Sequence, residues 1–302
     1  MAFRPPAREG ISPRKAMLHG TVPAAPQYWA AEAGDSPFPA GALLEPGTRL
    51  ERPIPAWYHP EVPPEPPIPF DYQVLYADEH LLVVDKPHFL PTTSNGRIVR
   101  ETLQTRLRVD MDNDEIVPLH RLDRLTAGVV VCSVNPRTRG LYQHMFQDRQ
   151  MHKTYRARVT QPLQFEGMVT LRMAKPHGSR QVVVDPAGTP TQTFVRASGK
   201  DVELQPLTGH THQLRVLLNH LGSPICGDDT YPVGSGFKSL MAHPSPPPGL
   251  SPVGVFPFSS QLAGTPVANA HAASKGRRGS ATPCSIRCTV DRATPIAAAS
   301  CP

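Results

Sequence analysis

Asp123 is the residue with the clearest chemical potential, since it lies between Arg121 and Arg124 in the stretch 120–124, His-Arg-Leu-Asp-Arg. An acid held between guanidinium groups stays ionised, because nearby positive charge favours its charged form. Such a carboxylate suits a nucleophile or a base that acts on an anionic polymer, whose phosphates the arginines can contact. The simpler alternative is a surface turn in which the aspartate bonds to its own backbone.

Two later segments carry further polar groups. Residues 153–157, Lys-Thr-Tyr-Arg-Ala, place the aromatic ring of Tyr155 and two cations on an expected strand. Residues 207–216, Leu-Thr-Gly-His-Thr-His-Gln-Leu-Arg-Val, place Arg215 on an expected helix, and a Gly-Asp-Asp loop follows. Taken one at a time, each has an ordinary explanation: a sheet tyrosine, a solvated arginine and a loop.

In this order, the three segments resemble the RluA family of RNA pseudouridine synthases. The resemblance covers about residues 71–240 and includes 78–87, Asp-Glu-His-Leu-Leu-Val-Val-Asp-Lys-Pro, which is similar to the family's opening hairpin. It implies an isomerase, an intramolecular transferase that detaches uracil from N1 and reattaches it through C5 to the same ribose, without a cofactor. It also implies the pseudouridine synthase fold, which is α+β with a mixed, largely antiparallel central sheet flanked by helices.

The resemblance assigns catalytic roles to three residues. Asp123 matches the essential carboxylate, and either attack on C1′ or removal of a proton from C2′ needs an ionised oxygen close to the sugar. Arg215 matches the arginine that pairs with this aspartate. Tyr155 matches the aromatic residue that stacks on the uracil.

RNA contacts are implied for four further residues. Arg121 matches the residue that enters the base stack when the target nucleotide is flipped out. Lys153 and Arg124 are candidates for phosphate contacts. His210 stands where the family commonly has arginine, and because histidine is mostly neutral at about pH 7, we expect weaker RNA binding rather than lost chemistry.

The composition divides the 302 residues into three parts. Of 37 prolines, 16 lie in residues 1–70, which predicts a proline-rich N-terminal arm or a reduced RNA-binding region, with disorder over 1–20. Residues 71–240 are predicted to form the catalytic domain. Residues 241–302 are rich in Ala, Pro, Ser and Gly and carry much of the formal net charge of +6, which predicts a disordered, atypical tail.

Hydrophobic patterns within 71–240 predict the elements that position these residues. Strands are expected at 73–76, 81–84, 129–134, 154–160, 182–184 and 193–196. Helices are expected at 97–108, capped by Ser94 or Asn95, after Asn135-Pro136, and at 211–221 before Gly222. A segment at 240–243, Leu-Met-Ala-His, is at best a remnant of a strand that the family carries there.

No metal site is predicted. The five cysteines form neither a disulfide framework nor two well-spaced pairs, and Cys284 and Cys288 alone do not indicate zinc. A metal hydrolase that uses His210 and His212, with His120, Asp123 and Asp228 nearby, is an alternative that metal analysis would separate.

A second alternative is a catalytically impaired RNA-binding relative of the family. Retention of Asp123, Tyr155 and Arg215 argues against it, because a pure RNA binder has no need of a carboxylate near phosphates. The chain has no apolar run of membrane-spanning length and no apolar signal segment. We therefore expect a cytoplasmic monomer with ribosomal or transfer RNA as its partner and no membrane association.

Overall fold

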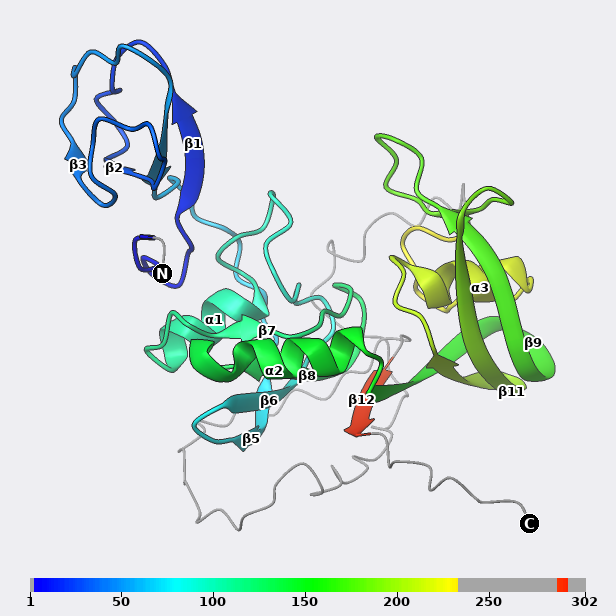
Figure 1. The fold of residues 1–302 in the computed structure, drawn as a ribbon. Helices are drawn as coiled ribbons and strands as arrows, with labels where there is room; N and C mark the ends of the chain where they lie inside the picture. Colours follow the sequence, from blue (N-terminus) through cyan, green and yellow to red (C-terminus); the bar gives the residue numbers. More distant parts are fainter. Residues whose placement is uncertain (1–2, 233–286, 293–302) are drawn as a thin grey trace, which may run out of the picture. The chain divides into compact units, whose positions relative to one another are not determined.

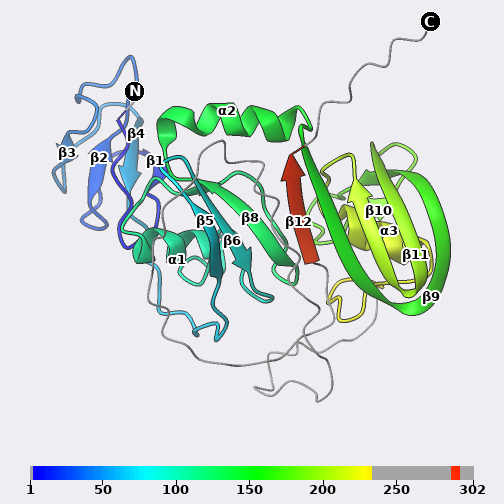
Figure 2. The same ribbon diagram turned by 90° about the horizontal axis from the view of Figure 1, so that it is seen from below.

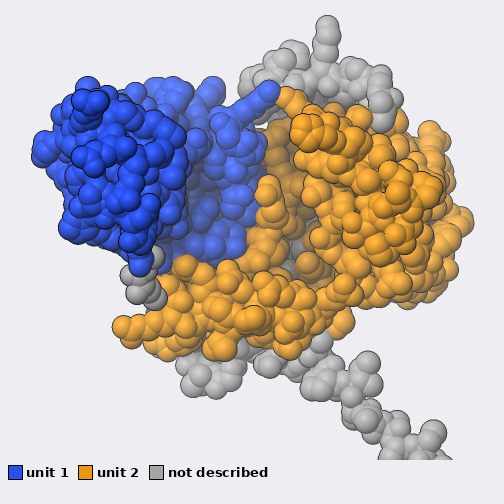
Figure 3. Space-filling view, turned by 45° about the horizontal axis from the view of Figure 1, so that its top comes forward, with its two compact units in different colours: residues 1–69, 90–118 blue, residues 70–89, 119–302 orange. Residues whose placement is uncertain are grey.

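The computed structural model describes residues 3–232 and 287–292 (Figure 1). The chain divides into two compact units (Figure 3). The first comprises Met1–Pro69 and Leu90–Pro118, and the second comprises Phe70–Phe89 and Leu119–Pro302. Every candidate catalytic or RNA-binding residue named from the sequence belongs to the second unit.

The first unit contains a four-stranded antiparallel sheet in the order β1-β4-β2-β3 (Figure 2). Its strands are β1 Arg14–Leu18, β2 Tyr28–Ala30, β3 Leu43–Leu44 and β4 Ile54–Tyr58. Leu18, Ile54 and Ala56 belong to a buried cluster on one face of this sheet. The prediction of disorder over 1–20 is wrong for β1. A reduced RNA-binding region within residues 1–70, the alternative to an arm, stays a prediction. Strands this short, separated by prolines, leave no hydrophobic period long enough to recognise.

Helix α1, Leu103–Asp110, begins later than the sequence predicts. Its cap is Thr102, whose hydroxyl accepts a hydrogen bond from the backbone N–H of Thr105. The side chain of Asn95 instead accepts bonds from the backbone N–H groups of Arg97 and Ile98, so it closes a local turn. The cap was misplaced because an Asx turn and a helix N-cap have the same residue signature. The short strand β7, Val117–Pro118, also belongs to this unit.

The second unit is built on a larger sheet in which β10-β9-β12-β8-β6-β5 are neighbours and β11 also pairs with β9 (Figure 2). Its strands are β5 Gln73–Ala77, β6 Leu81–Lys86, β8 Ala127–Ser133, β9 Met151–Ala174, β10 Val183–Val184, β11 Thr189–Pro206 and β12 Arg287–Arg292. Pairing in this series is antiparallel except between β8 and β12. The predicted α+β class with a largely antiparallel central sheet is confirmed.

Strand β12 corrects part of the prediction for the tail. Residues 287–292 pair in parallel with β8 and antiparallel with β9, so this segment lies inside the sheet rather than beyond it (Figure 2). The segment was missed because Arg-Cys-Thr-Val-Asp-Arg is too short and too polar to show the alternation of a strand. The remaining tail, including 240–243, lies outside the described residues.

Two helices complete the second unit. Helix α2, Pro136–Gln147, begins at the predicted cap Asn135, whose side chain accepts from the backbone N–H of Arg137. Tyr142 and Phe146 pack against a cluster on β6 and β8. Leu141 is 69% exposed, because it lies on the far side of a helix that only partly contacts the sheet.

Helix α3, Gln213–His220, carries the second main cluster of the unit. Leu214 and Leu218 are buried against residues of β9 and β11, and the helix stops before Gly222, which has a left-handed φ of 75°. β9 contains the strand expected at 154–160, and its side chains alternate, since Ala157 and Val159 are buried while Arg156 and Arg158 are exposed. Arg215 thus lies on a helix that packs against β9 and β11 (Figure 1).

Candidate active site

Asp123 lies in a tight turn that precedes β8. Its backbone carbonyl accepts a hydrogen bond from the Thr126 N–H at 3.0 Å, and the adjacent Leu122 side chain is buried. Leu119 N–H donates to the Val131 carbonyl at 2.8 Å, which fixes the start of the turn against β8. The turn is therefore anchored on both sides of the carboxylate.

His120 holds the same turn from within the protein. Its Nε2 accepts a hydrogen bond from the Val131 N–H at 3.1 Å, and its ring stacks on Phe146 at 5.0 Å between centroids. Burial, with a smaller effect of the Lys153 charge, lowers the pKa of His120 to about 3. A neutral, stacked imidazole supports the turn and leaves proton chemistry to other groups.

Arg215 brings α3 into contact with this turn. Its Nη1 lies 3.2 Å from Asp123 Oδ2, and its side chain is only 10% exposed. Burial alone would lower the pKa of Arg215, but the hydrogen bond and charge of Asp228, followed by the charges of Asp123 and Asp229, raise it above its ordinary value. The guanidinium is thus a permanent charge beside the candidate catalytic carboxylate.

Asp228 fixes the orientation of that guanidinium. Its Oδ2 accepts from Arg215 Nε and its Oδ1 accepts from Arg215 Nη2, both at 2.7 Å. The same Oδ1 also accepts from the backbone N–H groups of Thr230 at 2.8 Å and Tyr231 at 3.1 Å. Two charge-assisted bonds in a planar fork leave only Nη1 to turn towards Asp123.

A third carboxylate, Asp229, links Arg215 to Arg124. Asp229 Oδ1 lies 3.2 Å from Arg215 Nη2, and its Oδ2 lies 2.8 Å from Arg124 Nη2. Burial would raise the pKa of Asp229, but the Thr230 hydroxyl and the two arginines lower it overall. Arg124 also lies 5.9 Å from the Phe89 ring centroid, so the guanidinium is held on two sides.

His212 contacts the network from the start of α3. Its backbone has a left-handed φ of 55°, which is uncommon for a residue with a side chain. Its Nδ1 lies 3.1 Å from the Tyr231 hydroxyl and its Nε2 lies 4.0 Å from Asp123 Oδ2. Burial and the charge of Arg215 lower the pKa of His212, although Asp123 and Asp228 oppose this effect.

Lys86 is a fully buried amine at the end of β6. It is 0% exposed, and its Nζ donates to the Pro87 carbonyl at 2.9 Å. Burial lowers the pKa of Lys86 to about 7, while the charges of Asp123 and Asp85 act in the opposite direction. A buried amine near neutrality adds a titratable group to the surroundings of Asp123.

The residues predicted to contact RNA are placed differently. Arg121 is exposed, whereas Arg124 is engaged by Asp229 as described above. Lys153 is half-buried on β9, and His210 forms a local turn in which its backbone N–H donates to Gln213 Oε1 at 3.0 Å. Tyr155 is half-buried on β9 and packs against the α3 cluster, outside the hydrogen bonds of Arg215.

Sequence reasoning brought Asp123 and Arg215 together but missed the residues that hold them. Asp229 appeared only as part of a loop, Asp228 only there and as a candidate metal ligand, and Lys86 only as part of the opening hairpin. A usable signal was present: an arginine on the buried face of a predicted helix needs acidic partners, and a Gly-Asp-Asp loop follows it closely. The left-handed backbone of His212 and Phe89 could not be predicted, because it is set by the folded turn.

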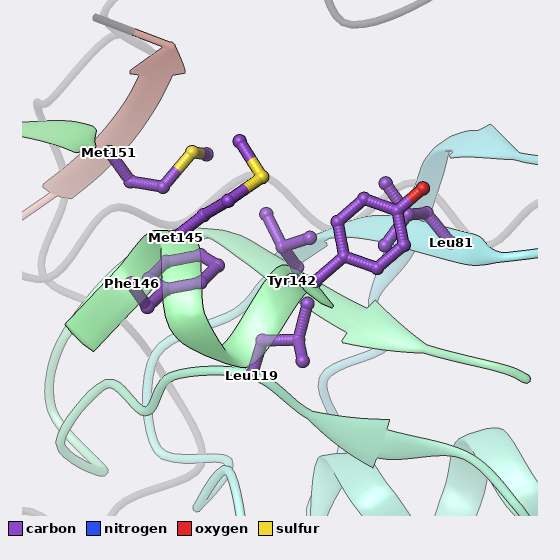
Figure 4. A pocket seen from close by; sticks show the side chains of 7 residues that line it. Leu81, Leu119, Tyr142, Met145, Phe146 and Met151 are labelled. Carbon is purple, nitrogen blue, oxygen red and sulfur yellow. The ribbon is translucent and has the colours of Figure 1, made fainter. Parts of the chain in front are cut away.

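One apolar pocket lies between α2 and the sheet, lined by Leu81, Leu119, Val131, Tyr142, Met145, Phe146 and Met151 (Figure 4). None of the acidic or basic residues of the network lines it. Within the described ranges no group of three or more His, Cys, Asp or Glu side chains is arranged to hold a metal ion. No helix in the described part of the chain is long and apolar enough to cross a membrane.

The sequence of this chain is similar to those of known proteins. Residues 80–220 match the family model described as RNA pseudouridylate synthase. The Dual-specificity RNA pseudouridine synthase RluA of Salmonella typhi is 37% identical over 169 residues, covering 52% of this chain and 76% of that protein. Pseudouridylate synthase RPUSD2 of Homo sapiens is 35% identical over 178 residues, covering 55% of this chain and 32% of that protein.

Among solved structures, Human RNA Pseudouridylate Synthase Domain Containing 1 superposes with a TM-score of 0.49 at 25% identity, covering 57% of this chain and 74% of that one. The relationship rests on the sequence match, which spans the Asp123 turn, β9 and α3. With more than a third of the aligned residues identical and three quarters of the Salmonella protein covered, this chain belongs to the RluA family of RNA pseudouridine synthases.

Proposed function

We propose that this chain isomerises specific uridines of ribosomal or transfer RNA to pseudouridine, with Asp123 as the essential carboxylate. The observation that carries the proposal is the contact of 3.2 Å between Arg215 Nη1 and Asp123 Oδ2, made by a guanidinium that Asp228 already orients. A buried, oriented cation beside a half-buried acid is a costly arrangement. A role for this cation in orienting a catalytic carboxylate would explain why the protein keeps the arrangement despite that cost.

The reaction needs no group beyond the protein and the RNA. The N1–C1′ bond of the uridine breaks, a C5–C1′ bond forms, N1 gains a proton and C5 loses one. Asp123 either attacks C1′ or takes the C2′ proton, and both routes use a carboxylate oxygen within reach of the ribose. Tyr155 stacks on the detached uracil and keeps it close for reattachment.

Positive side chains of the second unit would meet the RNA phosphates. Arg121 is exposed next to Asp123, which supports its proposed entry into the base stack. Lys153 shares β9 with Tyr155, two residues away and on the same face of the strand. Arg124 and His210 complete the proposed RNA contacts. We further propose that the protein acts in the cytoplasm as a monomer.

The test is pseudouridine formation on unmodified ribosomal and transfer RNA transcripts by the wild type and by Asp123→Asn. We expect product from the wild type alone. A matched control is Asp201→Asn, because Asp201 is exposed on β11 and loses the same charge. Equal product from the wild type and Asp123→Asn would overturn the role of Asp123. RNA binding without product from the wild type would favour a catalytically impaired RNA-binding relative.

A further inference from the structure

The sheet of the first unit has a second face that the core does not cover. Backbone register aligns Lys15 on β1 with Trp57 on β4, Trp57 with Trp29 on β2, and Trp29 with Leu43 on β3. Residues in register on neighbouring strands share one face of a sheet, so these four side chains form a continuous row. We name Lys15, Trp57, Trp29 and Leu43 the tryptophan row.

The next row of the same sheet shows that the two faces differ. Ala16, Ala56 and Ala30 are in register one residue along, and Ala56 and Ala30 are 0% exposed. Side chains alternate along a strand, so the tryptophan row faces away from this core. Leu43 is 47% exposed, and both tryptophans are only half-buried. An exposed apolar face of this kind marks an interaction surface.

Two cations are held over this face. The guanidinium of Arg4 lies 5.5 Å and the ammonium of Lys15 lies 5.9 Å from the centroid of the Trp57 ring. Neither forms an ion pair with a carboxylate of the described chain, and the four strands contain no acidic residue. Cations fixed by an aromatic ring rather than neutralised by an acid stay available to a phosphate.

The segment that carries Arg4 is tied down on the same face. Trp57 Nε1 donates to the Phe3 carbonyl at 3.0 Å, and the Phe3 ring lies so close to Gly41 that a side chain there would collide with it. His59 Nε2 lies 2.9 Å from the Pro6 carbonyl, and its ring packs edge-on against Trp29. The cations and the two indoles are therefore ordered before any ligand arrives, which reduces the entropy cost of binding.

We propose that the tryptophan row, together with Arg4, binds a single-stranded segment of RNA. Bases stack on the indoles and phosphates contact Arg4 and Lys15, the combination by which single strands are bound without sequence preference. A second copy of the chain fits less well, because pairing this face with itself would bring four unneutralised cations together. The proposal rests on RNA being the substrate, and it adds a binding surface on the first unit.

The chain provides its own probe, because Trp29 and Trp57 are its only two tryptophans. We would titrate full-length Asp123→Asn protein with unstructured oligouridine and follow tryptophan emission. We expect saturable quenching that weakens as salt is raised, since stacking quenches indoles and phosphate contacts release counterions. The Asp123→Asn variant prevents turnover during the titration.

Surface substitutions test the residues individually. Lys15→Gln and Arg4→Gln should each weaken binding and reduce the slope of log K against log salt by about 0.7. Trp57→Leu should weaken binding roughly tenfold. Arg52→Gln is the control, because Arg52 is exposed in the same unit but already lies 3.7 Å from Asp35. Circular dichroism and melting curves of each variant must match the parent.

Two results would overturn the proposal. Binding of a labelled oligonucleotide, seen by anisotropy, with no change in tryptophan emission would place the RNA elsewhere. Emission that depends on protein concentration alone, with a dimer in sedimentation, would assign the face to a second copy. The proposed function fails separately: quenching without pseudouridine from the wild type leaves the tryptophan row standing, and pseudouridine without quenching removes only the row.

Discussion

Arg215 binds Asp228 more closely than it binds Asp123. Its Nε and Nη2 each lie 2.7 Å from an oxygen of Asp228, whereas its Nη1 lies 3.2 Å from one oxygen of Asp123. Asp228 has a side chain that is 3% exposed, and that of Asp123 is 34% exposed. The buried carboxylate therefore holds the arginine, and the carboxylate of Asp123 is the more accessible of the two.

Asp228→Asn should release Arg215 from the orientation in which it contacts Asp123. The amide cannot repeat both charge-assisted bonds, so Arg215 would lose its fixed direction and kcat should fall roughly a hundredfold. Stability should fall by about 2 kcal/mol, because a buried charge loses its partner. Single-turnover rates and urea unfolding measure the two effects. Asp229→Asn is the control, because the Asp229 side chain is 41% exposed and should cost less than about 1 kcal/mol.

Arg215→Lys should retain the positive charge and still fail. An ammonium is a point charge and cannot bind both oxygens of Asp228 while reaching Asp123, so we expect a loss of activity of roughly a hundredfold or more. RNA affinity measured by filter binding should stay near that of the wild type. Arg196→Lys is the matched control, because Arg196 pairs with Glu166 on the exposed side of β11. Activity of Arg215→Lys near the wild-type level would show that charge alone is enough.

Lys86 should make stability depend on pH. Its pKa is about 7 in the folded protein, below its ordinary value of 10.5, so the unfolded chain binds the proton more strongly between these values. Stability should therefore rise as the pH goes from about 7 to about 9.5. Urea unfolding of the wild type and Lys86→Met over this range measures the rise, which should be absent in the variant. If the free energy of unfolding changed with pH in the same way in both proteins, folding would not lower the pKa of Lys86.

Phe89 should respond to substitution in an unusual order. Its φ is 68°, and its ring lies 5.5 Å from Phe70 and faces Arg124. Phe89→Gly loses the ring but relieves a left-handed backbone that costs roughly 1 kcal/mol, whereas Phe89→Leu loses the aromatic contacts and keeps the strain. We expect the glycine variant to be the more stable of the two in thermal melts. The opposite order would mean that side-chain burial outweighs the backbone cost.

Features that depend on residues close together in the chain could be predicted from the sequence, and features that depend on distant residues could not. The β-branched run of β8, the cap at Asn135 and the leucines of α3 were predictable, because each depends on neighbours within a few residues. Asp123 and Arg215 were predicted together only through the family resemblance, since 92 residues separate them along the chain. The hydrogen bonds of Asp228 to Arg215 and the burial of the Lys86 amine depend on tertiary packing. They could not be derived from local patterns.

The first unit shows a different limit. Trp29 and Trp57 lie far apart in the chain, and strands of two to five residues give no reliable period. Only cross-strand register shows that Trp29 and Trp57 are neighbours. Pro136 was informative because proline at the start of a helix has a defined role, whereas the many prolines before residue 70 obscured the sheet.

Strand β12 determines when the protein can finish folding. It follows every other described strand in the chain, yet it lies between β8 and β9, which carries Tyr155. During synthesis, β8 and β9 leave the ribosome long before their common neighbour, so both would wait with unpaired backbone edges that favour aggregation. A chain cut short before Arg287 would keep Asp123 and Arg215 and still lack the strand that joins the two halves of its sheet.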